Sequence, residues 1–259
     1  MNAIRSLLAL PELKHWPHDL NAPETTTLHG SIIRRKPFLH ALYCEWYYSM
    51  KQLAADLPAG QKIEIGSGAG FLKEVVPEVI TTDVLALPTV DRVISAEKLP
   101  FDDGSVAAIL GVDVFHHIPN VESFLREADR CLLRGGRIVL IEPANSVWGR
   151  FIYQHFHHEP FDPSAGWTFA ATGPLSGANG ALPWIVFVRD RKLFQEWFPR
   201  LKVLSITRHT PLRYLLSGGV SMRSLTPAWT FGLWSGLEFV LSPLSRVFSM
   251  FQTIVVEKQ

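Results

Sequence analysis

Apolar and polar residues follow two different rhythms along the chain, and together they predict strands that alternate with helices. Short, almost uniformly apolar runs indicate strands that are covered on both faces. Runs with apolar residues three and four positions apart indicate amphipathic helices. The strand-like runs are 62–65, 78–82, 92–95, 106–112, 137–141, 201–207 and 250–256, and the helix-like runs are 38–57, 71–76, 121–133 and 190–197. This alternation is typical of an α/β protein with a parallel sheet and helices on both faces.

Two segments interrupt the alternation. The first, residues 143–190, is rich in Gly, Pro, His and aromatic residues. A long stretch of this kind inside a compact domain is often a lid over a functional site. The second is strongly apolar and is predicted to be largely helical. We expect one domain over residues 1–259, with a helical N-terminal cap (1–57), a cofactor-binding half (58–142), the lid insertion (143–190) and a C-terminal half (191–259) that contains the apolar insertion (211–248).

The composition excludes several classes of protein. Of the 259 residues, 47% are hydrophobic, which excludes disorder for most of the chain. Twenty-five Lys and Arg balance 24 Asp and Glu, so the totals give no sign of a nucleic-acid-binding surface. Two cysteines make no disulfide framework and favour a reducing, cytoplasmic environment. The longest apolar stretch, 228–241, contains Glu238 and ends before Pro243, so it is too short for a bilayer span of about 20 residues.

The block Ile63-Glu-Ile-Gly-Ser-Gly-Ala-Gly70 is the most informative motif. A predicted strand runs into three glycines at alternate positions, and a predicted helix follows directly. Glycines let a ligand approach the backbone closely, and the free amides of the following helix bind polar groups. The dinucleotide-binding fingerprint is G-x-G-x-x-G, whereas here the third glycine comes one residue early. A nucleotide-cofactor oxidoreductase on a Rossmann sheet therefore remains an alternative.

Four further segments follow the glycine block in order. They are Asp83, Leu99-Pro-Phe-Asp-Asp-Gly-Ser105, Asp113-Val-Phe-His-His-Ile-Pro119 and Leu133-Arg-Gly-Gly-Arg137. With these motifs the chain resembles the class I S-adenosylmethionine-dependent methyltransferases, in the subgroup with small-molecule and lipid-type acceptors. The resemblance covers 60–142 well and 190–259 loosely. It implies a Rossmann-like, mostly parallel seven-stranded sheet.

The resemblance also implies an activity and a cofactor. The activity is methyl transfer from S-adenosyl-L-methionine to a small-molecule or lipid-linked acceptor, on oxygen or carbon, with S-adenosyl-L-homocysteine as product. The glycines would pass beneath the methionine part of the cofactor, and Glu64 would hold the ammonium group of that part. Asp83 would accept hydrogen bonds from both ribose hydroxyls. Many relatives have Asp where this chain has Ser95, next to the adenine. The cofactor-binding residues implied are Glu64, Gly66, Ser67, Gly68, Gly70, Asp83, Val84, Ser95, Ala96, Glu97, Asp113 and Val114.

The acceptor side is predicted from titratable residues. His116 and His117 follow the fourth strand, where the resemblance places the transferred methyl group, and a neutral histidine suits the removal of a proton from an acceptor. The lid segment offers a second set that could supply the base or bind the acceptor. This substrate-binding set is Tyr153, His155, His157, His158, Glu159 and Trp167. Helical spacing of His155, His158, Glu159 and Asp162 is the only sign of a metal site, and we expect no metal.

Two questions stay open at this point. The apolar helix near 229–241 is either a core or dimer helix or, through 225–248, a contact with the membrane surface, which would place the protein at the inner face of the membrane. A cofactor-binding scaffold without turnover is a third functional alternative. Nucleic acid is not expected as the acceptor, because the Asn-Pro and Pro-Cys signatures of base methylation are absent.

Overall fold

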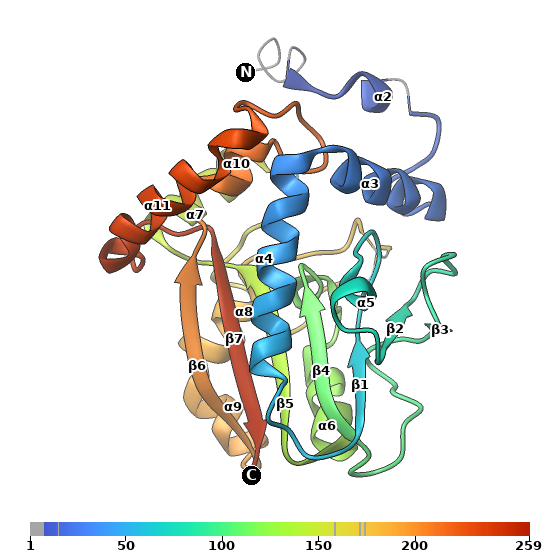
Figure 1. Cartoon of the computed structure of the whole chain (residues 1–259). Helices are drawn as coiled ribbons and strands as arrows, with labels where there is room; N and C mark the ends of the chain where they lie inside the picture. Colours follow the sequence, from blue (N-terminus) through green and yellow to red (C-terminus); the bar gives the residue numbers. More distant parts are fainter. Residues whose placement is uncertain (1–7, 15, 158, 171, 174) are drawn as a thin grey trace.

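A seven-stranded sheet forms the centre of the protein (Figure 1). The computed structural model describes residues 8–14, 16–157, 159–170, 172–173 and 175–259. The strands are β1 (Gln61–Glu64), β2 (Val79–Asp83), β3 (Arg92–Val93), β4 (Val106–Val112), β5 (Leu132–Pro143), β6 (Leu201–His209) and β7 (Phe251–Lys258). Their order is β3-β2-β1-β4-β5-β7-β6, and β7 runs antiparallel to both of its neighbours. The predicted Rossmann-like, mostly parallel sheet of seven strands is confirmed.

Helices cover both faces of this sheet. Figure 1 shows α4 in front of the sheet and α6, α8 and α9 behind it. The α-helices are α2 (Pro11–Lys14), α3 (Pro23–Arg35), α4 (Pro37–Leu53), α5 (Leu72–Val75), α6 (Val121–Cys131), α7 (Val147–Phe156), α8 (Leu182–Trp184), α9 (Arg191–Trp197), α10 (Arg213–Ser217) and α11 (Phe231–Leu241). Short 3₁₀ turns are η1 (Phe115–His117), η3 (Ala228–Thr230) and η4 (Ser242–Leu244), and η2 (Ile185–Arg189) is a π-helical turn.

Helix α4 shows how the hydrophobic pattern produces the packing. Pro37 stands at its first turn, where the missing amide hydrogen costs nothing. Apolar and aromatic residues recur every three or four positions and form one buried face against the sheet. The buried members are Phe38, Leu39, Leu42, Tyr43, Trp46, Tyr47 and Met50. The sheet supplies an equally apolar surface, because every residue of β4 except Val112 is buried.

The segment 143–190 is more regular than its sequence suggests. Ser146 caps α7, because its hydroxyl accepts the amide hydrogen of Gly149 at 2.8 Å. Further along, Ile185, Val186 and Phe187 are buried in the main core. The expectation that this stretch lacks elements is therefore wrong. Its Gly, Pro and His residues dilute the apolar pattern, and the helices are stabilised by contacts with the rest of the protein.

The apolar helix α11 lies at the surface. Within it only Glu238 is buried, whereas Leu233, Phe239 and Val240 are exposed. The alternative that this helix belongs to the core is wrong, because the buried position is occupied by the one charged residue and the apolar ones face outward. Among the described residues, no helix is long and apolar enough to span a membrane.

Candidate functional site

Two adjoining cavities open at the carboxyl ends of the parallel strands. One, of about 290 Å³, extends from Asp83 to Pro119. The other, of about 200 Å³, extends from the glycine loop to Tyr153 and Tyr214. The walls that both share include Gly66, Gly68, Asp113 and His117. This is the edge where ligands bind in open α/β sheets.

The glycine loop needs its glycines for two separate reasons. Gly66 and Gly68 adopt positive φ angles of 56° and 45°, which residues with a side chain rarely adopt. A Cβ at Gly66 would also lie 2.1 Å from Cγ2 of Val114. At Gly70 a Cβ would lie 2.6 Å from the hydroxyl oxygen of Tyr47, which accepts the amide hydrogen of Phe71 at 3.2 Å. The loop therefore packs directly on Val114 and α4.

Two carboxylates border the loop. Glu64 is buried at the end of β1, and burial raises its pKa to about 7, although a hydrogen bond with Ser67 acts in the opposite direction. Asp83 ends β2 and accepts amide hydrogens from Gly68 at 2.9 Å and from Leu85 at 2.8 Å. Burial raises the pKa of Asp83, and these backbone donors oppose the rise. A carboxylate has about four acceptor positions, so Asp83 can also accept hydrogen bonds from a ligand in the larger cavity.

The larger cavity continues along the ends of β3 and β4. Ser95, Ala96 and Glu97 line it beside Val84. The hydroxyl of Ser95 accepts the amide hydrogen of Glu97 at 3.2 Å. The carboxylate of Glu97 accepts the amide hydrogen of Asn120 at 2.8 Å, so this side chain connects the segment after β3 with the segment after η1.

The loop after β4 brings Asp113 to the junction of the cavities. Asp113 has a positive φ of 52°, a strained conformation for a residue with a side chain. Its pKa is raised to about 8, first by burial, against the effect of nearby His116. The loop thus brings Asp113 and the histidine pair of η1 to the same cavity.

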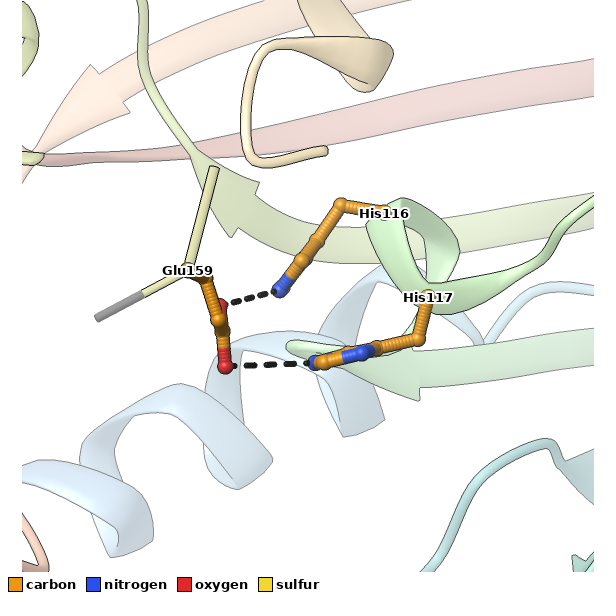
Figure 2. A group of neighbouring side chains, drawn as sticks. All are labelled: His116, His117 and Glu159. Carbon is orange, nitrogen blue, oxygen red and sulfur yellow. Dashed lines mark ion pairs between the residues drawn. The ribbon is translucent and has the colours of Figure 1, made fainter. Parts of the chain in front are cut away.

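Figure 2 shows His116, His117 and Glu159 grouped together, and all three line the smaller cavity. Nδ1–H of His116 donates to Glu142 at 2.6 Å, and Nε2 of His116 lies 3.3 Å from Oε2 of Glu159. Nδ1–H of His117 donates to the carbonyl of Gly177 at 3.0 Å, and its Nε2 lies 3.6 Å from Oε1 of Glu159. Both Nε2 atoms thus face the same carboxylate.

Burial and neighbouring charge act differently on the members of this cluster. Burial by itself lowers the pKa of His116, but the carboxylates of Glu142 and Glu159 reverse this and hold it well above its usual value. For His117, burial and the neighbouring charge of His116 lower the pKa to about 4. Burial would raise the pKa of Glu159, but its contacts with His116 hold it well below the usual range.

The matching family model agrees with the position of this site. A model described as a methyltransferase domain matches residues 63–140, from the glycine loop almost to the end of β5. This part of the chain therefore matches a methyltransferase domain, in agreement with the resemblance that its motifs carry.

Comparisons with other proteins give more distant likenesses. A search of curated proteins found no match. Among solved structures, geranyl diphosphate C-methyltransferase from Streptomyces coelicolor A3(2), in complex with Mg²⁺, geranyl diphosphate and S-adenosyl-L-homocysteine, is 17% identical over 97% of this chain and 92% of that one, with a TM-score of 0.48. The YcgJ protein from Bacillus subtilis is 14% identical over 83% and 99%, with a TM-score of 0.47. A putative methyltransferase from an antibiotic biosynthesis pathway of Anabaena variabilis is 18% identical over 82% and 96%, with a TM-score of 0.45. Likeness at this level says nothing about the acceptor.

The residues predicted for the acceptor side of the methyltransferase separate into two groups. Tyr153, His157 and Glu159 line the smaller cavity, and Tyr153 donates its hydroxyl hydrogen to the carbonyl of Met250 at 2.7 Å. His155 is exposed on the outer side of α7, and Trp167 is buried beside Asp190, so neither lines the two cavities. His158 lies outside the described residues.

Sequence reasoning missed Glu142, which holds the cluster in place. This fully buried carboxylate accepts amide hydrogens from Val114 at 2.9 Å and Phe115 at 2.7 Å, in addition to the His116 hydrogen. Its place at the end of the fifth predicted strand was the available signal, because the carboxyl ends of parallel strands meet at one edge. Aromatic residues of the cap and the C-terminal half also line the smaller cavity, and no local motif marks them. They are Tyr43, Tyr47, Tyr214 and Phe251.

Proposed function

We propose that the methyltransferase binds S-adenosylmethionine across the junction of the two cavities and methylates an oxygen of a small or lipid-linked acceptor. The observation that carries the proposal is the division of the site: a carboxylate-lined cavity beside the glycine loop adjoins one that ends at the His116–His117–Glu159 cluster. Asp83 would accept the ribose hydroxyls beside Ser95, Ala96 and Glu97. Glu64 would face the ammonium group, for which a buried carboxylate is well suited.

The histidine pair supports an oxygen acceptor. Because Nδ1–H of His117 donates to a carbonyl, its Nε2 carries a lone pair directed into the cavity. In the proposed reaction the acceptor's O–H proton passes to this lone pair, the S–CH₃ bond breaks as the O–CH₃ bond forms, and the sulfonium becomes a neutral thioether. His116 lies between two carboxylates and positions Glu159 beside His117. A C-directed reaction on an already activated carbon would need no such base.

Cofactor binding tests the first part of this proposal. We expect Asp83→Ala to weaken S-adenosylmethionine binding about tenfold to a hundredfold, because two hydrogen bonds to a charged acceptor contribute about 1.5–3 kcal/mol. Asp83→Asn, which keeps an oxygen for the Gly68 and Leu85 amides, separates ligand binding from loop structure. Calorimetry with S-adenosylhomocysteine as competitor measures the effect, and exposed Asp102→Ala is the control.

Three results would count against this assignment. Unchanged affinity in a folded Asp83→Ala protein would move the ribose contact elsewhere. Binding of NADH in place of S-adenosylmethionine would favour an oxidoreductase, and cofactor binding without transfer to any acceptor from extracts would favour a scaffold.

A surface next to the smaller cavity supports a lipid-linked acceptor. We define the apolar face as the exposed apolar side chains of α7, of η3 and the loop before it, of α11, and of η4 and the turn that follows it. Its members are Val147, Phe151, Phe156, Leu225, Trp229, Leu233, Leu237, Phe239, Val240, Leu244 and Val247. The amide hydrogen of Trp148 bonds the carbonyl of Val247, and its ring contacts Phe248, so the two parts of this face are joined. Figure 1 shows α7 and α11 on the same side of the molecule.

The charges around the apolar face favour an anionic membrane surface as its partner. Arg150, Arg223 and Arg246 are exposed beside it. Glu238 is the single Asp or Glu between residues 201 and 256, and it is buried against Arg213. A surface that exposes aromatic and basic residues and few acidic ones is typical of proteins that bind peripherally to anionic lipid. We therefore propose that this face lies on the membrane and admits a lipid-linked acceptor to the cavity.

Vesicle binding tests the membrane proposal. We expect the protein to sediment with phosphatidylcholine vesicles containing phosphatidylglycerol, and Trp229→Glu or Phe239→Glu to weaken binding at least about tenfold, since each removes an aromatic contact worth about 1.5–3 kcal/mol. Val93→Glu, an exposed apolar residue on β3, is the matched control. A stable dimer in solution that the same Phe239→Glu change dissociates would show a protein partner instead.

A further inference from the structure

Three side chains that can each offer a metal ligand meet in the smaller cavity. His116 and His117 come from η1, and Glu159 comes from the segment after α7 (Figure 2). Their ligand atoms all lie within 4.8 Å of one another. Two histidines and one carboxylate with the remaining positions open are a recurring donor set for Zn²⁺ and other first-row divalent ions.

The hydrogen bonds behind the histidines select the ring nitrogens that would bind a metal. Glu142 and the Gly177 carbonyl can only accept, so both Nδ1 atoms carry hydrogen. Nε2 of each ring then faces the Glu159 carboxylate. A divalent ion that replaces the hydrogen between His116 and Glu159 would be bound by both Nε2 atoms and by this carboxylate. A carboxylate behind a histidine is also the usual arrangement that orients a metal-binding imidazole.

The distances suit ligands of one ion. Zn–N and Zn–O bonds of about 2.0–2.1 Å in a tetrahedron place two ligand atoms about 3.3 Å apart. The two Nε2–oxygen separations are 3.3 Å and 3.6 Å. The second exceeds the length of a hydrogen bond, so a proton between His117 and Glu159 does not account for it.

The charge of the cavity also favours a cation. Glu64, Asp113 and Glu159 line it, with Glu142 directly behind His116. Among the described residues that line it there is no lysine or arginine. A divalent ion would add positive charge to this carboxylate-rich end of the cavity.

We propose that His116, His117 and Glu159 bind one divalent transition-metal ion, with Zn²⁺ as the reference ion, and that an acceptor oxygen takes an open position on it. This inference rests on the proposed methyl transfer and changes how the acceptor is activated. A hydroxyl, phenol or enol bound to the ion loses its O–H proton to water more readily, and the metal-bound oxygen then forms the O–CH₃ bond as the S–CH₃ bond breaks. The proposal replaces the sequence-based expectation of a site without metal.

Metal titration tests the proposal without an acceptor. The chelator-treated full-length protein is titrated with Zn²⁺ against a chromophoric competitor, and with Co²⁺ while its visible absorption is recorded. We expect one ion per chain and Co²⁺ bands of a site with mixed nitrogen and oxygen ligands. Glu159→Gln and His117→Ala should weaken Zn²⁺ binding at least about a hundredfold, and Glu142→Gln about 10–100-fold. His155→Ala is the control, because this exposed histidine lies in the neighbouring helix outside the cavity.

The outcomes separate the metal site from the methyl transfer. Absence of a one-to-one Zn²⁺ complex in the wild-type protein, or equal affinity in folded Glu159→Gln, overturns the metal site. S-adenosylmethionine calorimetry on the same preparations tests the proposed function independently. Cofactor binding and transfer that persist in fully chelated protein without loss of rate would leave the histidine base as the activating group and overturn the metal proposal.

Discussion

Replacement of His117 by alanine is expected to lower kcat about 10²–10⁴-fold while S-adenosylmethionine affinity changes less than about threefold. The expectation follows from position, because Nε2 of His117 points to Glu159 in the acceptor cavity and its Nδ1 is held by the Gly177 carbonyl. Whether this nitrogen removes a proton or binds a cation, its loss removes activation of the acceptor and leaves Asp83 and Glu64 in place. Single-turnover kinetics on the true acceptor and cofactor calorimetry measure the two quantities separately.

Matched variants decide between a chemical and a structural role of His117. Glu159→Gln should show the same loss of kcat, whereas His155→Ala should retain nearly full activity because His155 lies outside the cavities. A His117→Asn protein that melts like wild type but loses turnover would support the chemical role. Wild-type kcat in His116, His117 and Glu159 variants together would exclude acceptor activation by this cluster and favour transfer to an already activated carbon.

Arg213→Met is expected to lower the free energy of unfolding by about 3–5 kcal/mol. The buried guanidinium donates to Glu238 at 2.6 Å and to both oxygens of Glu45 at 2.6 and 2.8 Å, and so joins α10, α11 and α4. Without it, Glu238 would remain buried with the amide hydrogens of Leu212 and Arg213 but no positive charge. Removing one partner of a buried pair costs far more than the pair contributes over an apolar equivalent.

Urea denaturation measures this effect, with Glu45→Gln as the comparison. Glu45 is about half exposed, so solvent screens its charge and its loss should cost less than about 1 kcal/mol. Because Arg213 also fixes the helix that carries the apolar face, vesicle binding should fall in the Arg213→Met protein before global unfolding. A change in unfolding free energy below about 1 kcal/mol for Arg213→Met would mean that α11 is held by its apolar contacts alone.

Much of the cofactor half could be predicted because its signals are local. The glycines at 66, 68 and 70 and the carboxylate at Asp83 each stand at the end of a predicted strand, and a parallel sheet brings such ends to one edge. The seven strand-like runs agree with the observed strands to within five residues at each end. The apolar character of β4 and β7 reflects burial on both faces, whereas the edge strands β3 and β6 are largely exposed. Helix α7 was missed, since Gly, Arg and His interrupt its apolar pattern and its stability comes from contacts with Val247 and Phe248.

The sequence by itself determined the individual strands and the glycine loop, because each depends on residues that are close together in the chain. Only the tertiary structure decided that Glu159 meets His116 and His117, which lie more than 40 positions earlier, and that Glu142 stands behind them. It also decided that α11 turns its single charge inward and its apolar residues outward, because Arg213 compensates the buried Glu238. Such contacts depend on how distant segments pack, and the residues that take part carry no local pattern that distinguishes them from ordinary polar positions.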